Sequence, residues 1–579
     1  MPPWAVAAVA FCAALAVSGA IVAAQPIHSP WWTYADADST YVSSSLNLLA
    51  GVQIRFLDHP GLPLEELGTV VFGTRYAVHR ATGSHQSTLQ YVDSQMLDLN
   101  KAKSTWRTMA ILIYLAGAAL AFLLAARLFG HWTYGLAGGL LWVAAPGLAE
   151  MSIQYRADVS LAIGVLVGTF LLGRAARTRS AGPFGWAAFT IGFTTMVKLP
   201  AIGLLLSLAI LAVARTPGDG WAGAAWQGTR AFARRRRWLL AAVALLWVAL
   251  AADLNRHWWR SYRPDRERVV IAVVPVLVVA GFAAACWAVR RTTENRVARR
   301  IFDPFYAFLG AGFLAGLAVP ITFDVPDGLT ALIRILDGLT GGGVNGGIPL
   351  FATSLHQLIE FPLRQALVFF VLAGVAAVYG LARRDVLPAA WFAGAALLGV
   401  MAQARLATVH YFAPAYIVSI FGALWLFQAL GRRRFMPILA WALVLYAVVP
   451  QLQNRNAPTR TAAAFAHNES ASLDFIASRL RPGELGVTPS SWPNGSSRYS
   501  YVVQPYVNYT PPYPYTFVDS TQSSAAIAAA RHLRLRYYTG PDVLQLPAAT
   551  GTMQIGTIGR FRVRKLRPDV VELLSGPGA

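Results

Sequence analysis

Apolar residues gather in runs of about 15 to 20 positions, close to the length that crosses a membrane as a helix. These runs recur along the chain up to about residue 450. They predict about thirteen spanning helices, near residues 4–24, 108–126, 133–148, 159–173, 184–197, 199–214, 238–252, 269–289, 304–322, 365–382, 388–403, 411–430 and 436–450. We therefore expect an all-α polytopic membrane domain over residues 1–450. Its first run lacks a preceding basic stretch, so we interpret it as a retained helix rather than a signal peptide.

The pattern changes after residue 450. Apolar positions are scattered there, Tyr and Pro are dense between Tyr499 and Tyr515, and turn residues are frequent. A helical pattern and several strand-like runs predict a small C-terminal α/β domain over residues 451–579. The helix is expected near 460–480, and the strand-like runs are at 485–487, 537–538 and 558–566.

Composition supports a membrane protein. Hydrophobic residues make up 56% of the 579 positions and charged residues only 13%, and the mean hydropathy is +0.47. Soluble domains carry about 25% charged residues. The net charge of +22 would by itself fit nucleic-acid binding. The basic residues instead form short clusters between the apolar runs, which favours a topological role and no nucleic-acid partner.

These basic clusters predict the orientation of the chain, because loops rich in Lys and Arg stay in the cytoplasm. With a cytoplasmic N-terminus, the basic loops 127–132, 174–183, 215–237, 290–303, 383–387 and 431–435 all fall inside. A long first loop, 25–107, the loop 323–364 and the C-terminal region then face outside. Frequent Ala and Arg hint at a bacterial source, so we expect a multi-pass protein of the bacterial inner membrane with an extracytoplasmic C-terminus.

One predicted outer loop does not follow the charge rule. Residues 253–268 are basic and aromatic. Trp258 and Trp259 fit an interfacial aromatic belt. The arginines of the same loop fit a phosphate-binding patch instead. The sequence leaves both interpretations open.

The first outer loop holds residues that a simple connection does not need, since loops longer than about 15 residues are usually functional or disordered. Asp36 and Asp38 lie beside several aromatic residues. In an extended segment both side chains point to the same side. A carboxylate at the membrane face is partly desolvated, so its basicity can suit the deprotonation of a hydroxyl. One aspartate would then act as the base, and the other could hold a metal or the acceptor.

The motifs of this loop resemble those of the class-C glycosyltransferases. Asp38-Ser-Thr-Tyr41 and Leu48-Leu-Ala-Gly51 match the acidic motif and the helix that follows it, and Leu57-Asp-His-Pro-Gly-Leu62 is similar to the second element. The most similar members are protein O-mannosyltransferases, the aminoarabinose transferase of lipid A and bacterial lipopolysaccharide-core transferases. The resemblance implies a multi-spanning enzyme that takes a sugar from a polyprenyl phosphate on the outer side of the membrane.

Later elements follow the same order. Arg156-Ala-Asp158 lies in the second outer loop, where the family holds basic or acidic residues. Thr195-Met-Val-Lys198-Leu-Pro200 is similar to an element whose Lys is thought to meet the lipid phosphate. His410-Tyr411-Phe-Ala-Pro414 resembles the late element with Tyr and Pro. The resemblance therefore implies that Tyr41, Arg156, Asp158, Lys198, His410 and Tyr411 bind the substrate or its phosphate.

The first loop also departs from the family. Asp36-Ala-Asp38 replaces the usual Asp-Glu or Glu, and Asp38 is the preferred equivalent because Tyr41 follows at the expected distance. His59-Pro60-Gly61 replaces the commoner paired prolines. Asp36, Asp38 and His59 could together bind a divalent metal ion, the one cofactor we consider. Asp38 fits a helix N-cap as well, and His59-Pro60 also fits a rigid turn.

Basic residues at predicted outer helix ends suit a phosphate leaving group, on which negative charge develops. Lys198, Arg156, Arg405 and His410 all occupy such positions. Each has a structural alternative. Lys198 could extend to the interface as long side chains do, Arg405 could serve topology, and His410 could be a hydrogen-bonded helix end.

The leading hypothesis is a membrane glycosyltransferase that moves a hexose or pentose from a polyprenyl-phosphate-linked donor to a hydroxyl of a glycan, lipid or protein acceptor. Direct displacement with Asp38 as base would invert the sugar. A transporter or flippase for a polyprenyl-linked glycan is the alternative, although such proteins usually show internal repeats and charges inside the membrane. A scaffold whose tail binds a partner is a third hypothesis. Membrane lipids are expected partners in each case.

Overall fold

The computed structural model describes residues 3–25, 27–28, 38–51, 61–97, 99–145, 147–214, 221–256, 266–292, 294–340, 363–405 and 409–431, a few positions between 441 and 448, and five strands of the tail. These residues divide into two compact units. The first unit holds residues 1–25, 57–64 and 109–455, and the second holds 26–56, 65–108 and 456–579. Each unit is described by itself.

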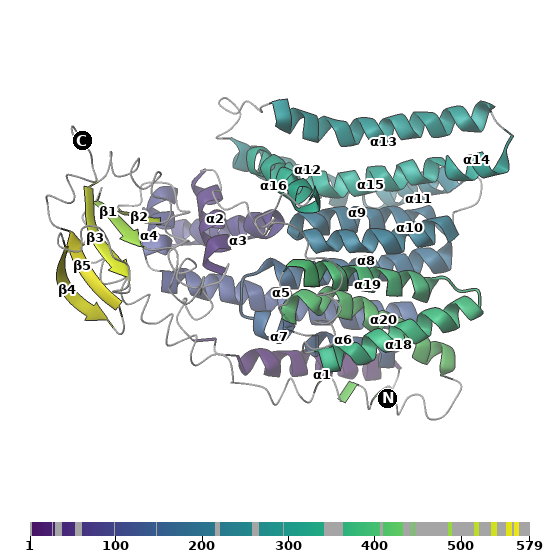
Figure 1. Ribbon diagram of the computed structural model, residues 1–579, viewed down its shortest axis with the longest axis horizontal. Helices are drawn as coiled ribbons and strands as arrows, with labels where there is room; N and C mark the ends of the chain where they lie inside the picture. Colours follow the sequence, from purple (N-terminus) through teal and green to yellow (C-terminus); the bar gives the residue numbers. More distant parts are fainter. Residues whose placement is uncertain are drawn as a thin grey trace. The chain divides into compact units, whose positions relative to one another are not determined.

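The first unit is helical, and its longer helices run roughly parallel to one another (Figure 1). Its elements are α1 (Pro3–Ala23), most of α5 (Leu99–Phe129), α6 (Trp132–Val143), α7 (Leu148–Met151), α8 (Ala157–Thr178), α9 (Ala181–Val197), the 3₁₀ turn η2 (Leu199–Gly203), α10 (Leu204–Ala214), α11 (Trp221–Arg235), α12 (Arg237–Asn255), α13 (Arg266–Thr292), α14 (Arg296–Ile301), α15 (Pro304–Ile321), α16 (Val325–Thr340), α18 (Leu363–Ala382), α19 (Leu387–Arg405), η3 (Val409–Phe412) and α20 (Ala413–Leu430).

The described helices fit a polytopic membrane protein. Seven of them are long and apolar enough to cross a membrane: 4–23, 102–129, 157–178, 237–255, 268–292, 297–321 and 413–430. Shorter apolar helices cover 199–214, 367–382 and 387–402. Twelve of the predicted spans coincide with a described helix. The last, 436–450, lies mostly outside the described residues, so the count of thirteen stays a prediction.

Helices α9 and α15 pack very closely because glycines face each other across the contact. A Cβ atom at Gly192 would collide with the carbonyl oxygen of Phe313, and one at Gly316 would collide with that of Phe189. Small residues allow such close approach in membranes, where apolar surface alone gives helices little reason to associate. The backbones of α9 and α15 therefore touch at these two glycines.

The ends of α5, α8 and α20 are joined by polar contacts around one arginine. The Arg177 guanidinium donates to the carbonyl of Leu128 and, over 3.1 Å, to Oε1 of Gln428. The amide of Gln428 donates to the carbonyl of Phe129 at 2.9 Å. These bonds satisfy carbonyls that the end of α5 leaves without a helical partner. Arg177 therefore has a structural role besides its contribution to the charge of this end.

The second unit includes helices where a polar loop was predicted. Residues 38–50, 65–81 and 88–97 lie in α2 (Asp38–Ala50), α3 (Leu62–Ala81) and α4 (Thr88–Leu97), and α5 begins at Leu99. Helices within this stretch were not predicted, and the assignment of residues 25–107 to an outer loop stays a prediction. Their apolar positions, such as the fully buried Val42 and Leu46, have helical spacing but lie among polar residues, so they form no long apolar run.

The tail contains a five-stranded sheet in the order β2-β1-β3-β5-β4. Its strands are β1 (Glu484–Thr488), β2 (Tyr515–Asp519), β3 (Arg534–Gly540), β4 (Thr552–Ile558) and β5 (Phe561–Leu566). β1 runs parallel to β2 and β3, and β5 runs antiparallel to β3 and β4. Strands were predicted at β1, β3 and β5, whereas β2 and β4 were missed. The predicted helix near 460–480 lies outside the described residues, so the complete α/β domain stays a prediction.

The predicted inner loops 215–237 and 290–303 also contain helices. α11 occupies Trp221–Arg235, and α14 occupies Arg296–Ile301. Clusters of arginine indicate a cytoplasmic connection between two spanning helices. Such a connection can itself be helical, because arginine is a good helix former. These segments connect spans as predicted, and their helical structure is the correction.

Candidate functional site

The candidate site is formed by two interruptions of the helical bundle. Between α7 and α8 the chain is irregular over residues 152–156, after Gly147 has opened α7 in the left-handed region with a φ of 72°. Between α9 and η2 the backbone of Lys198 is extended, with φ −163° and ψ 132°, and Pro200 lies in the first turn of η2. Proline favours a helix start and cannot continue the preceding hydrogen bonds. The local sequence therefore ends α9 at Val197, and Lys198 lies at the break between α9 and η2.

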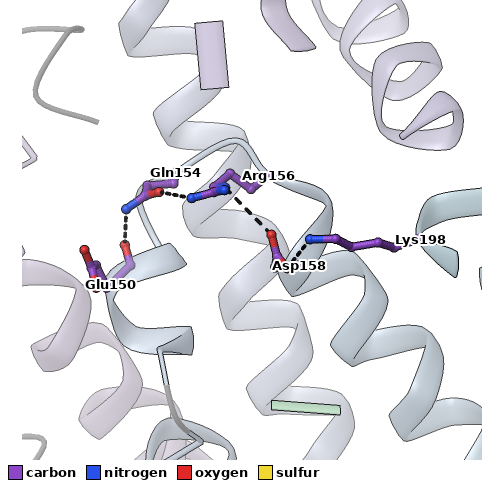
Figure 2. A network of polar contacts seen from close by, with 5 residues as sticks. All are labelled: Glu150, Gln154, Arg156, Asp158 and Lys198. Atoms are coloured by element: carbon purple, nitrogen blue, oxygen red, sulfur yellow. Dashed lines mark hydrogen bonds and ion pairs between the residues drawn. The ribbon is translucent and has the colours of Figure 1, made fainter. Parts of the chain in front are cut away.

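Three charged side chains meet at these interruptions, as Figure 2 shows. The ammonium Nζ of Lys198 lies 2.5 Å from Oδ1 of Asp158. The Nε atom of Arg156 lies 3.7 Å from Oδ2 of the same carboxylate. All three residues are buried, with 3%, 2% and 9% of the surface of Lys198, Asp158 and Arg156 exposed.

The electrostatics of this cluster favour an anion. One carboxylate faces two cations, so these three side chains together carry one excess positive charge. Asp158 lies in the first turn of α8, where the helix dipole also favours negative charge. Burying ions is costly unless they are paired and hydrogen-bonded. Asp158 thus orients both cations at one position, and oriented cations are the groups that bind a negatively charged ligand.

Tyr411 adds an aromatic surface to the same cluster. Its ring centroid lies 4.2 Å from Nζ of Lys198, within the range of a cation–π interaction. Tyr411 belongs to η3, which leads directly into α20, and only 8% of it is exposed. The fold therefore brings together three segments centred on residues 158, 198 and 411, which are far apart in the sequence.

A chain of hydrogen bonds extends the cluster toward α7 (Figure 2). Nη1 of Arg156 donates to Oε1 of Gln154 at 3.4 Å, and Nε2 of Gln154 donates to the backbone carbonyl of Glu150 at 3.3 Å. Gln154 is buried. The sequence predicted neither Gln154 nor Glu150 as site residues. The only signal was the polar stretch between two apolar runs, which does not show which residue orients Arg156.

Glu150 is the titratable group at the edge of this chain. Part of its side chain is exposed, but protein atoms crowd its carboxyl and raise its pKa above the ordinary value. The positive charge of Arg156 offsets part of this rise in pKa. The carboxyl and the guanidinium therefore interact electrostatically, and the charge near Arg156 depends on pH.

Tyr155 connects the site segment to the start of α3. Its hydroxyl donates to the backbone carbonyl of Leu64, and its ring is fully buried. Tyr155 lies directly between Gln154 and Arg156 in the chain. The contact fixes the backbone from which Arg156 extends, and this role too was not predicted.

The other predicted site residues are described less fully. Asp36 and His59 lie outside the described residues, and for Asp38, Arg405 and His410 the structure describes only the backbone. α2 begins at Asp38. Tyr41 is buried in α2 within the second unit. Among the described side chains, no group of three or more His, Cys, Asp or Glu residues could hold a metal ion. The predicted metal site and the choice between Asp36 and Asp38 therefore stay predictions.

Comparison with known proteins gives a structural likeness only. No family model matches the chain, and no curated protein matches it in sequence. The oligosaccharyltransferase of Archaeoglobus fulgidus, solved with zinc and sulfate, aligns over 92% of this chain and 67% of its own, with a TM-score of 0.43 and 12% identity. ArnT of Cupriavidus metallidurans, solved with undecaprenyl phosphate, aligns over 99% of both chains, with a TM-score of 0.31 and 15% identity.

The same ArnT in its apo state aligns over 93% of this chain and 94% of its own, with a TM-score of 0.32 and 15% identity. The chain is therefore similar to two proteins of solved structure, an oligosaccharyltransferase and ArnT, both at low identity. The likeness to them is distant, and it assigns no role to any residue of this chain.

Proposed function

We propose that the chain is a membrane glycosyltransferase that moves a sugar from a polyprenyl-phosphate donor to the hydroxyl of an acceptor. The observation that carries this proposal is the buried cluster of Arg156, Asp158 and Lys198 at the ends of membrane helices. A lipid-linked donor places its phosphate at the membrane face while its polyprenyl chain stays among the apolar helices. The cluster has two cations at the ends of membrane helices, where the phosphate of such a donor would lie.

The cluster suits the leaving group of such a reaction. Negative charge develops on the phosphate as the bond between the sugar and the phosphate oxygen breaks. Lys198 and Arg156 would stabilise this charge, and preorganised cations cost no rearrangement when the reaction occurs. Asp158 orients both cations before the donor arrives. Tyr411 restricts the position of the Lys198 ammonium from the side of η3.

The acceptor side of the proposal rests on the first-loop motifs. The carboxylate of Asp38 would take the proton of the acceptor hydroxyl, and the oxygen would attack the anomeric carbon from the side opposite the phosphate. The new bond forms as the old one breaks, so the configuration of the sugar inverts and polyprenyl phosphate leaves. Asp36 is the substitute base. His410, Tyr41, His59 and Arg405 are proposed to line the substrate site.

A divalent metal ion held by Asp36, Asp38 and His59 is a further part of the proposal. Carboxylates and imidazole are suitable ligands for several divalent ions. A metal bound there would stabilise negative charge on the donor phosphate. No step above requires it, and loss of transfer after removal of metal by a chelator, restored by adding the ion back, is the measurement that would support it.

We also propose that the cluster faces outward and the N-terminus faces the cytoplasm of a bacterial cell. Asp158 lies in the first turn of α8, whereas Arg174 and Arg177 lie near its end and Arg179 follows it, so the cluster and these arginines lie at opposite ends of one helix. The positive-inside rule then assigns the arginines to the cytoplasm. Undecaprenyl phosphate, with which the Cupriavidus enzyme was solved, belongs to the class of lipid proposed here.

The test is sugar transfer by the purified protein in liposomes that contain a polyprenyl-phosphate sugar. Lys198→Met should lower kcat/KM by about 100-fold, the usual effect of removing one group that stabilises developing charge. Asp38→Asn should abolish transfer while the protein stays folded. Arg127→Gln, an exposed change at the end of α5, is the control.

Wild-type transfer rates in Asp38→Asn would reject Asp38 as base. Movement of the intact donor across the bilayer without any covalent transfer would instead support the flippase alternative. Formation of a complex that depends on residues 451–579, with neither transfer nor movement, would support the scaffold.

A further inference from the structure

We infer that the adjacent residues Gln154 and Tyr155 position two different parts of the candidate site. Gln154 orients the guanidinium of Arg156 toward the phosphate of the donor. Tyr155 holds the start of α3, and with it the element that contains His59, at a fixed place relative to that guanidinium. Both are positioning residues that act through other groups, and their roles in catalysis rest on the proposed function.

The irregular segment between α7 and α8, residues 152–156, is buried throughout. Each of its five residues is at most 9% exposed. Irregular backbone inside a membrane protein is tolerated where its polar groups find partners in the protein. The N–H of Gln154 donates to the carbonyl of Met151 at 3.1 Å, and the N–H of Arg156 donates to the carbonyl of Gln154 at 3.0 Å. These bonds fix the backbone of the segment, so its side chains leave it in defined directions.

Neighbouring side chains of this segment reach different partners. The backbone of Arg156 is extended, with φ −129° and ψ 151°, and successive side chains of an extended chain point to opposite sides. Oε1 of Gln154 accepts from Nη1 of Arg156 at 3.4 Å. The hydroxyl of Tyr155 instead donates to the backbone carbonyl of Leu64 in α3. One short segment therefore contacts both the arginine of the cluster and the start of α3.

The side-chain amide of Gln154 is suited to hold an arginine (Figure 2). An arginine can only donate hydrogen bonds, so the amide oxygen has to face it and the amide nitrogen faces an acceptor. That acceptor is the backbone carbonyl of Glu150, at 3.3 Å from Nε2. Nε of Arg156 also lies 3.7 Å from the carboxylate of Asp158. The guanidinium is thus held from two sides, which restricts the direction in which it can meet a phosphate.

The hydroxyl of Tyr155 holds the beginning of α3. Leu64 lies in the first turn of this helix, and its N–H donates to the carbonyl of Gly61 at 2.7 Å. Leu64 is buried and belongs to the same compact unit as the cluster. His59, which is proposed to line the substrate site, precedes Gly61 by two residues. A displacement of reacting groups by about 1 Å can lower a rate by about 100-fold. The bond from Tyr155 therefore matters for more than the stability of the helix.

The opposite end of the bundle contains a matched comparison for Gln154. Gln428 accepts from Arg177 at 3.1 Å and donates to the carbonyl of Phe129 at 2.9 Å. This is the same pattern of one arginine and one backbone carbonyl around a glutamine amide. Arg177 lies in the last turn of α8, whereas Asp158 lies in the first. A glutamine that orients a phosphate-binding group can therefore be distinguished by experiment from one that only stabilises a helix end.

Binding of undecaprenyl phosphate tests the role of Gln154. The lipid is titrated into the full-length protein in detergent, and the apparent Kd is measured by native mass spectrometry. Gln154→Met should raise Kd by about fivefold or more, because the contact of an arginine with a phosphate is charge-assisted and depends on direction. Gln428→Met and Tyr155→Phe should each change Kd less than twofold. Equal increases in Gln154→Met and Gln428→Met would overturn the inference.

Hydrogen exchange of the full-length protein tests the role of Tyr155. Tyr155→Phe should speed the exchange of the backbone amides in the first turn of α3 by about fivefold, the factor that one lost hydrogen bond of ordinary strength gives. Gln154→Met should leave this exchange within twofold of the native rate. So should Tyr134→Phe, which changes a half-buried tyrosine of α6. Unchanged exchange in Tyr155→Phe, or an equal increase in Gln154→Met, would overturn the inference.

Transfer kinetics connect the two roles to the proposed reaction. Tyr155→Phe should lower kcat by about tenfold and leave the donor KM within twofold, because the displaced element does not hold the phosphate. Gln154→Met should raise the donor KM. Parallel changes of kcat and donor KM in both variants would show one shared structural role and overturn the inference. Absence of transfer by the native protein would reject the proposed glycosyl transfer, whereas lipid binding and hydrogen exchange would still decide what each residue positions.

Discussion

Lys198 and Asp158 form a buried ion pair of 2.5 Å across 40 residues of sequence, with Asp158 in the first turn of α8 and Lys198 at the break between α9 and η2. Neither residue is explained by packing alone, because an ammonium and a carboxylate are expensive to remove from water. Arg156 on the same carboxylate and Tyr411 over the ammonium make the pair part of a larger arrangement. The contribution of this arrangement to the stability of the fold and its contribution to the proposed reaction can be measured by separate experiments.

The first prediction concerns the stability of this pair. Asp158→Asn removes the carboxylate that two buried cations share and should lower the free energy of unfolding by about 3 kcal/mol or more. Lys198→Met/Asp158→Asn should recover part of that loss, since the ammonium that lay 2.5 Å from the lost carboxylate is removed with it. Asp253→Asn is the control. It breaks an exposed pair with Arg256 at 3.0 Å and should cost less than about 1 kcal/mol. Denaturant unfolding in detergent measures all three, and equal effects of the two Asp→Asn changes would contradict a buried role.

The second prediction separates the ring of Tyr411 from its hydroxyl. Tyr411→Phe keeps a ring over the Lys198 ammonium and should leave the donor KM within about threefold of the native value. Tyr411→Leu removes the ring and should raise the donor KM by about tenfold, because Lys198 loses its aromatic contact. Steady-state transfer kinetics distinguish these outcomes. A similar loss in both variants would assign the role to the hydroxyl instead.

The third prediction concerns the contact of α9 with α15. Gly316→Leu forces a side chain against the backbone of Phe189 and should lower the unfolding temperature clearly, with a cost of about 2 kcal/mol or more. Gly281→Leu in α13 is the matched control, since a Cβ there meets nothing within 4 Å. Thermal unfolding followed by loss of monodisperse protein measures both. Equal tolerance of the two leucines would show that the helices can separate at low cost.

The fourth prediction concerns pH and Glu150. Crowding by protein raises the pKa of its carboxyl, so the folded state favours the protonated form more than the unfolded state does. This contribution to stability is fully present below the unfolded pKa and is lost as the pH rises through the raised folded pKa. Glu150→Gln should remove this pH dependence from the unfolding curves. Unchanged pH dependence in the variant would assign the effect to another group.

The spanning helices were largely determined by the sequence. Long apolar runs must leave water and satisfy their backbone groups as helices, so α8, α13 and α15 could be placed within a few residues. The break at Lys198 was also readable, because Pro200 limits the helix before it. Short helices in polar surroundings, such as α2, α4 and α11, were missed because their apolar spacing is weak and depends on what covers them.

The sequence predicted most of the candidate site residues, but it did not predict the contacts among them. The basic loops predicted that Arg156, Asp158, Lys198 and Tyr411 lie on one side of the membrane, but the sequence could not show that both cations share the Asp158 carboxylate. Gln154 and Tyr155 were not predicted, because the polar stretch that contains them does not show which residue makes which contact. Such contacts depend on which helices pack together and how closely, and glycines such as Gly192 set that distance through collisions that only the neighbouring backbone defines. The sequence by itself determined where charged residues interrupt the apolar runs. The tertiary structure decided which of these residues contact one another, because that depends on how the helices pack.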